Sequence, residues 1–221
     1  SSYIAAYDLE GNQLWNQTMG QAIGSVRDMV VVNGFAGSPN SLLVAGNQLI
    51  SRLSLDNGSI LSSNFAVFDS PIEKVFAVRQ PDNEELAVNV VLFTADGLVH
   101  GLNQQGAEMA HMGWPFVLVG MPEVIKSYDQ GAIEAFQPKV TTFLVANRDG
   151  RVTQLNLTDN RPALIWTLAD FGAVKAITWA DLDKDGRPDT GAFGNRDGDI
   201  RLYDQLQSRT PRQILNLQLA S

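Results

Sequence analysis

A repeated pattern of short strands constrains the fold of this chain more than any other feature. Similar turns begin at Ala45, Thr94, Ala146 and Gly194, about 50 residues apart. An apolar run precedes each turn and a strand of alternating apolar and polar residues follows it, which is typical of a β-hairpin. Further candidate strands flank each hairpin, for example "EKVFAVR" before the second and "ALIWTLADF" after the third. Each repeat is therefore expected to contain four strands.

Four short strands that recur at this period predict an all-β chain built from β-propeller blades, because each small sheet buries its faces against its neighbours. A β-sandwich is the main alternative, but it does not require four similar copies. No run with a 3.6-residue period is long enough to predict a helix. We expect one propeller domain or propeller fragment over 1–221, with blades at about 25–70, 72–118, 122–170 and 174–220.

The N-terminal residues 3–18 predict only the outer two strands of a further blade. Four full blades and a partial one are expected to belong to a larger ring, completed by sequence outside the chain or by another polypeptide. Propellers commonly have about four to eight blades, and unpaired blade edges invite aggregation. The alternative is a compact four-bladed ring in which the N-terminal pair replaces the last strand.

An acidic loop opens the last predicted hairpin. Its carboxylates alternate along the chain around Gly186, where glycine allows a sharp bend; they are Asp181, Asp183, Asp185 and Asp189. Ca²⁺ takes about six to eight oxygen ligands, which such a loop can supply. An EF-hand loop would have a Glu where this chain has Ala192, and the flanking residues resemble strands, so the loop is predicted to join two β-strands. The alternative is a surface turn in which the Asp side chains cap their own backbone.

Residues 174–205 resemble an FG-GAP/VCBS-type repeat, the calcium-binding repeat of integrin-alpha-like and bacterial surface propellers. The motif is "ITWADLDKDGRPDTGAFGNRDGDIRLYDQ", and "AAYDLEGNQLW" near the N-terminus is similar to an element of quinoprotein-like blades. The resemblance implies calcium bound by the side chains of the four loop aspartates and by the backbone carbonyl of Arg187. The corresponding turns of the other repeats lack three alternating acids. One calcium site is therefore expected.

Composition and charge limit which binding partners and which cellular location are expected for this chain. The chain has 16 Lys and Arg against 24 Asp and Glu, a net charge of −8, and no basic stripe, so no nucleic-acid partner is expected. No apolar run reaches the length of about 18 residues that a transmembrane helix needs. A loop of this calcium type requires roughly 10⁻⁴ to 10⁻³ M calcium, which favours an extracellular, cell-surface or periplasmic location. Three glycosylation sequons carry little weight: Asn16, Asn57 and Asn156.

Catalytic motifs are not evident in the sequence. His100 and His111 have no nucleophile motif nearby, so both are interpreted as strand or turn residues. Cysteine is absent, which excludes disulfides and thiolate chemistry. Three tryptophans fall at similar places in fourth strands and are interpreted as packing residues rather than sugar-stacking platforms: Trp15, Trp114 and Trp166.

These features favour a non-enzymatic binding or scaffold module outside the cytoplasm. In this hypothesis the propeller binds a protein or glycan partner, and one Ca²⁺ ion stiffens the loop 181–189. The alternative is an enzyme-associated propeller, either a degenerate quinoprotein-like dehydrogenase or an accessory domain of a secreted hydrolase. The fold alone does not distinguish these functions, because propellers host many of them.

Overall fold

Strands account for nearly all of the regular structure. The computed structural model describes residues 2–32, 40–78, 87–129, 141–182, 184 and 189–219. The chain divides into two compact units, Ser1–Val117 and Leu118–Ser221. The described residues form 18 strands and two short 3-10 helices, η1 (Gln21–Ile23) and η2 (Ala110–Met112). The prediction of an all-β chain is confirmed.

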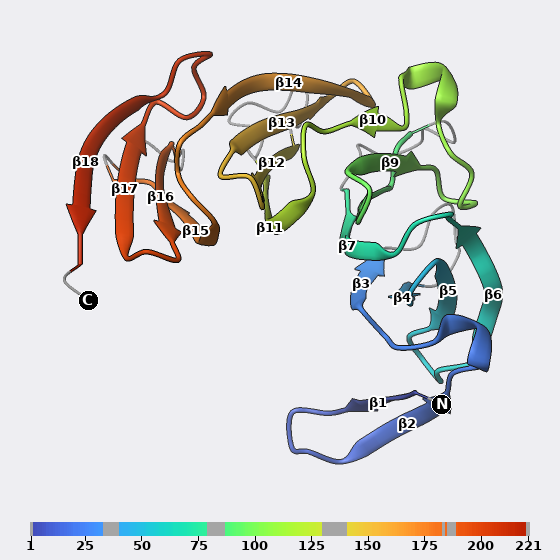
Figure 1. Ribbon diagram of the computed structural model, residues 1–221. Coiled ribbons are helices and arrows are strands. Elements are labelled where there is room, and N and C mark those ends of the chain that lie inside the picture. The colour runs from blue at the N-terminus through green and yellow to red at the C-terminus, as the bar shows by residue number, and fades with distance from the viewer. Residues whose placement is uncertain are drawn as a thin grey trace. The chain divides into compact units, whose positions relative to one another are not determined.

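The first unit contains three antiparallel sheets, whose strands follow one another in chain order (Figure 1). Sheet I pairs β1 (Tyr3–Tyr7) with β2 (Gln13–Thr18). Sheet II comprises β3 (Asp28–Val32), β4 (Ser41–Ala45), β5 (Leu49–Ser54) and β6 (Ile60–Val67). Sheet III comprises β7 (Ile72–Ala77), β8 (Val90–Thr94), β9 (Leu98–Leu102) and β10 (Phe116–Val117).

The second unit contains two antiparallel sheets of four strands, again in chain order. Sheet IV comprises β11 (Pro122–Asp129), β12 (Thr141–Asn147), β13 (Val152–Thr158) and β14 (Arg161–Leu168). Sheet V comprises β15 (Val174–Ala180), β16 (Thr190–Asn195), β17 (Asp199–Asp204) and β18 (Arg212–Gln218). Each four-stranded sheet of the chain lies within one of the four predicted repeats.

The fourth strand of sheet III is shorter than the sequence pattern predicts. The run "EMAHMGWPF" contains η2 and only the beginning of β10, which spans two residues. Gly113 adopts a left-handed conformation, with φ of 91°, that does not continue a strand. Pro115 has no N–H to donate to a ladder. Because of these two residues, the chain pairs with β9 only from Phe116 onward.

Asp-Gly turns join the second and third strands of three sheets, as the repeat predicts. Gly97 and Gly150 have φ of 85° and 84°, a region that favours glycine. Their N–H groups donate to the carbonyls of Thr94 and Asn147 at 3.0 and 3.1 Å. The turn chemistry of the sequence therefore fixes where the central hairpin of each of these sheets reverses.

Adjacent sheets within each unit pack face to face. Leu43, Ala45 and Ile50 on sheet II form one buried cluster with Ile72, Val90 and Leu92 on sheet III. In the second unit, Leu144, Ala146 and Val152 on sheet IV cluster with Val174, Ile177 and Phe193 on sheet V. Most of these facing residues come from the same positions of the repeat in both units. The core of each unit therefore lies between adjacent sheets, where the apolar face of one sheet covers the apolar face of the next.

Sheet I is the outer pair of strands of a further blade. Ile4 and Trp15 pack against Val44 and Leu53 of sheet II in a third buried cluster. The indole N–H of Trp15 donates to the carbonyl of Leu55 at 2.8 Å, 40 residues ahead. The predicted partial N-terminal blade is confirmed.

A matching hydrogen bond in the second unit supports this assignment of sheet I. The indole N–H of Trp166 on β14 donates to the Leu206 carbonyl at 2.9 Å, also 40 residues ahead. Trp15, Trp114 and Trp166 are all buried, so the packing interpretation of these tryptophans is confirmed. In both cases the buried indole N–H has the hydrogen-bond partner that a buried polar group needs. This bond also fixes the fourth strand that carries the tryptophan to the next sheet.

Candidate functional site

The acidic loop joins the first two strands of sheet V, as the sequence predicts. Ala180 on β15 pairs with Thr190 on β16. Asp181 and Asp189 follow and precede this pair, so they occupy facing positions at the neck of the loop. Both are partly buried. Three of the five predicted calcium ligands lie outside the described residues: Asp183, Asp185 and Arg187.

Asp181 and Asp189 are the two predicted ligands that contribute side chains within the described residues, and carboxylate oxygens are the ligands that Ca²⁺ prefers. The Asp189 carbonyl accepts a hydrogen bond from the N–H of Leu206 at 3.0 Å, which ties one side of the neck to the loop after β17. Within the described residues no three metal-ligating side chains form a cluster.

A polar network that the sequence did not predict lies in sheet III. His100 Nδ1 is 2.5 Å from Glu108 Oε1, and His100 Nε2 is 3.5 Å from the hydroxyl of Thr94. The Thr94 hydroxyl also lies 2.6 Å from Asp96 Oδ1. Burial raises the pKa of Asp96, but hydrogen bonds from Thr94 and from the Leu98 N–H lower it by more, so Asp96 stays ionised.

Thr94, His100 and Glu108 are arranged like the hydroxyl, base and acid of a hydrolytic triad. Their surroundings, however, support a structural role. Thr94 is fully buried, and the ring of Phe68 packs on His100 with centroids 4.8 Å apart. The hydroxyl is therefore closed to a substrate, and its short contact to the Asp96 carboxylate engages the proton that a base would have to remove. The interpretation of His100 as a strand residue agrees with its place in β9.

Ion pairs connect the first strands of neighbouring sheets in both units. Asp28 on β3 accepts hydrogen bonds from Lys74 and from the N–H of Val75 on β7, both at 2.9 Å. Glu123 on β11 pairs with Lys175 on β15 and, at 3.0 Å, with Arg148. The hydrogen bond from Lys175 lowers the pKa of Glu123, and the charges of Lys175 and Arg148 lower it further against the effect of partial burial.

Glu123→Gln is expected to reduce the loss of stability on acidification. The pKa of Glu123 is lower in the folded protein than its ordinary value of 4.5, so the ion pairs stabilise the fold above that pH. Their contribution is lost as the pH falls through the folded-state pKa. Urea unfolding at neutral pH and near pH 3.5 measures this loss, which should be smaller by about 0.3–1 kcal/mol in the variant because the pair is partly exposed. An equal loss in both proteins would contradict the assignment.

Comparison with known proteins gives matches of structure but none of sequence. No family model matches the chain, and no curated protein matches it. BBS1N, solved in complex with ARL6DN, superposes on 88% of this chain with a TM-score of 0.58 and 16% identity. BamB from Moraxella catarrhalis covers 100% of the chain with a TM-score of 0.54 and 16% identity. Sqt1 from Saccharomyces cerevisiae covers 98% with a TM-score of 0.60 and 13% identity.

These three proteins have β-propeller or propeller-like folds. The chain has a β-propeller fold. It spans 52%, 57% and 55% of the length of BBS1N, BamB and Sqt1, respectively. Identities this low establish the fold alone, so the resemblance of residues 174–205 to FG-GAP/VCBS-type repeats stays a prediction.

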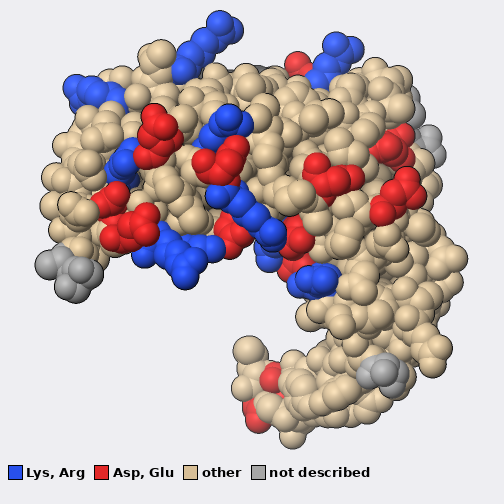
Figure 2. Space-filling model, viewed as in Figure 1, with Lys and Arg blue, Asp and Glu red and all other residues tan. Residues whose placement is uncertain are grey.

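The charged side chains of the propeller blades are mixed in sign on the face shown in Figure 2. Lys and Arg alternate there with Asp and Glu, and the described residues of this face show no extended region of basic side chains alone. Among the described residues, no helix is long and apolar enough to cross a membrane.

Proposed function

We propose that the chain is a non-enzymatic protein-interaction module whose last blade, sheet V, binds a β-sheet of a partner protein. The proposal rests on the face of sheet V that points away from sheet IV. A row of aliphatic side chains crosses this face, where Leu202 pairs with Leu215 and Ile200 pairs with Leu217. Leu215 and Leu217 are 38% and 45% exposed. Contiguous exposed apolar side chains on a protein surface mark interaction sites.

The repeat indicates what covers such a face. In sheet II, Ala45 pairs with Ile50 and Ile50 with Ala66, and all three are buried against sheet III. The same positions of sheet V are occupied by Gly194, Ile200 and Leu217. A sheet with complementary aliphatic side chains therefore fits there, as sheet III fits on sheet II. Aliphatic side chains offer a glycan no hydrogen bonds, so a protein partner is favoured.

Loss of partner binding on charging this face tests the proposal. The chain is used as bait, cross-linked after capture, and compared with a Leu215→Lys, Leu217→Lys double variant. Leu164→Lys is the matched control, because Leu164 on β14 is 52% exposed and lies on another sheet. We expect the double variant to lose a partner whose cross-links map to a β-strand, while the control retains it. A set of partners that is unchanged in the double variant would overturn the proposal.

We further propose that the loop 181–189 binds one Ca²⁺ ion, with ligands from Asp181, Asp183, Asp185, Asp189 and the Arg187 carbonyl. Bound calcium would offset the repulsion among the carboxylates and order the connection into β16. The facing positions of Asp181 and Asp189 at the neck support this assignment. Sites of this type need calcium concentrations found outside the cytoplasm, so an extracellular, cell-surface or periplasmic location goes with the calcium proposal.

Asp183→Ala is expected to abolish the stabilisation of the second unit by calcium. A ligand at tenfold above its Kd stabilises the folded state by about 1.4 kcal/mol, or roughly 5 °C in Tm for a unit of this size. Differential scanning calorimetry with and without CaCl₂ measures the shift. Asp69→Ala, an exposed acid in the first unit, should keep the shift of the wild type. An equal shift in Asp183→Ala would contradict the site.

A further inference from the structure

We propose that the first unit binds a β-hairpin of a partner protein at the free edge of β1, where two strands would complete sheet I. Sheet I has two strands, whereas the other four sheets of the described residues have four. The bound hairpin would pair with β1 and cover exposed side chains of β3 in sheet II. This hairpin site lies within the first unit and shares no residue with the face of sheet V.

The two strands of sheet I correspond to the third and fourth strands of the other sheets. β2 carries Trp15, whose indole bonds to the next sheet as the tryptophan of the fourth strand β14 does. The N–H of Met19 after β2 donates to the Ser2 carbonyl at 2.8 Å. In the same way, the N–H of Phe171 after β14 donates to the Gly150 carbonyl at 3.1 Å. β1 therefore corresponds to β13, which pairs with β14 on one edge and with β12 on the other.

The free edge of β1 presents backbone groups that have no strand to pair with. Within the described residues, β1 pairs with β2 alone. Residues of antiparallel strands alternate between pairs that exchange backbone hydrogen bonds and pairs that exchange none. Because Ser2 belongs to a bonded pair, Tyr3 and Ala5 direct their N–H and C=O groups toward the free edge. Such an edge is a template for a further strand.

Two apolar side chains of β3 are exposed on the face of sheet II that looks toward sheet I. Met29 on β3 pairs with Val44 on β4, and the next pair on the same face joins Val31 to Leu42. Val44 and Leu42 belong to the cluster that sheet II forms with sheet I. Met29 and Val31 are nevertheless 47% and 50% exposed. Sheet I therefore covers only part of this face.

In sheets III and V, the position of Met29 is covered by the preceding sheet. Val75 on β7 and Ile177 on β15 hold this position, because each pairs with the matching residue of its second strand. They are only 3% and 5% exposed. Val75 is buried in a cluster with Val32 of β3, which is the first strand of sheet II. A first strand added to sheet I would cover Met29 in the same way.

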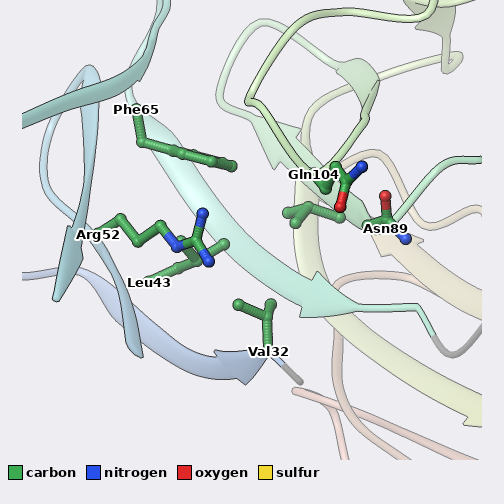
Figure 3. Close-up of a pocket in the computed structure, with 7 residues that line it drawn as sticks. Val32, Leu43, Arg52, Phe65, Asn89 and Gln104 are labelled. Carbon is green, nitrogen blue, oxygen red and sulfur yellow. The ribbon is translucent and has the colours of Figure 1, made fainter. Parts of the chain in front are cut away.

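The other face of sheet II shows how such aliphatic side chains are normally buried. Val32 of β3 and Leu43 of β4 line the space between sheets II and III (Figure 3) and belong to the buried cluster of these sheets. β3 therefore has a covered face toward sheet III and an uncovered face toward sheet I. The uncovered face is apolar, as an interaction surface requires.

A hairpin fits this site better than a single strand. A strand paired with β1 takes the place of β12, and only the strand beyond it, in the place of β11, lies against β3. The side chains toward sheet II should be aliphatic at alternate positions, as Val124, Leu144 and Ala146 of sheet IV are toward sheet V. All other described strands already belong to four-stranded sheets, in this chain and in any second copy. We therefore assign the hairpin to a partner protein.

A peptide with the sequence of residues 122–147 serves as the probe, because it contains β11 and β12, the first two strands of sheet IV. A scrambled peptide of the same composition is the control. Fluorescence anisotropy of the labelled peptide measures its affinity for the chain, and NMR locates the bound peptide. We expect saturable binding of the first peptide only, slower hydrogen exchange of the Tyr3 and Ala5 N–H groups, and a shift of the Met29 methyl signal.

Two variants of the site should weaken peptide binding. Met29→Lys should weaken it at least about tenfold, because the hairpin would bury an unpaired charge. Met121→Lys is the matched control, since Met121 is 54% exposed in the second unit, and it should bind like the wild type. Ala5→Pro removes one N–H from the free edge and should weaken binding about fivefold. Both folds are expected to persist, because Met29 is exposed and proline is tolerated where an edge N–H faces solvent.

Three results would each overturn the proposal: equal binding of the scrambled peptide, unchanged exchange at Tyr3 and Ala5, or unchanged affinity in either variant. Self-association of the chain that Met29→Lys abolishes would assign the site to a second copy and overturn it as well. The Leu215→Lys, Leu217→Lys variant should bind the peptide like the wild type. Loss of peptide binding in that variant would place the hairpin on sheet V, so failure here and failure of the proposed role of sheet V are distinguishable.

Discussion

Phe193→Ala is expected to lower the free energy of unfolding of the second unit by about 3–5 kcal/mol, the cost of emptying a fully packed aromatic site. Phe193 is 1% exposed on β16. Its ring meets Phe171 edge-on at 5.5 Å and Tyr203 at 5.8 Å, so three rings from different segments share one centre. Its removal leaves a cavity in the cluster that joins sheets IV and V.

Chemical denaturation followed by fluorescence measures this effect. Ile214→Ala on β18 is the control, because Ile214 is 46% exposed, and we expect a change within about 0.5 kcal/mol. The transition of the second unit should move while that of the first unit stays in place, since the cluster lies within Leu118–Ser221. A change below about 1 kcal/mol for Phe193→Ala would show that the two sheets do not share a packed core.

Gly46→Ala is expected to destabilise the first unit by about 3 kcal/mol, through overpacking. A methyl group at residue 46 would lie 1.9 Å from the carbonyl oxygen of Ile23 and 2.6 Å from its Cγ1. Ile23 belongs to η1 and is 1% exposed, so it has no free space into which to move. The same carbonyl accepts the N–H of Asn47 at 3.2 Å, and this bond would break if η1 were displaced.

Gly20→Ala separates the steric effect from the general effect of adding a side chain. Gly20 has φ of −62°, which alanine adopts without strain, and a methyl group there would meet no atom within 4 Å. We expect a change between zero and a gain of about 1 kcal/mol, because alanine restricts the unfolded chain. Thermal unfolding of both variants checks the pair. Similar losses in Gly46→Ala and Gly20→Ala would contradict the close approach of η1 to sheet II.

The architecture could be predicted from the sequence because the repeat depends on short local patterns of turn and strand residues. Asp-Gly turns at Asp96 and Asp149, with alternating strands on either side, set the central hairpins of sheets III and IV without reference to distant residues. The burial of Trp15 and Trp166 also follows from their place in the pattern. The shortening of β10 was missed, since the effect of Gly113 and Pro115 on the ladder outweighs the apolar character of the run.

The polar sites were less accessible to sequence reasoning, because they depend on which residues meet between strands. Nothing in the sequence pattern distinguishes His100 and Glu108, eight residues apart, from two exposed strand and turn residues. The calcium loop differs from these polar sites, because its aspartates lie close together in the sequence and could be recognised there. The structure describes only the neck of this loop.

Sedimentation equilibrium of the purified chain tests the proposed role of sheet V most directly. An aliphatic face that binds a partner sheet should also bind a second copy when no partner is present. We therefore expect the apparent mass to rise above 24.1 kDa with concentration, and the Leu215→Lys, Leu217→Lys variant to remain at 24.1 kDa. A wild-type chain that stays monomeric at every concentration would contradict an open, adhesive blade face and favour a ring that closes within the chain.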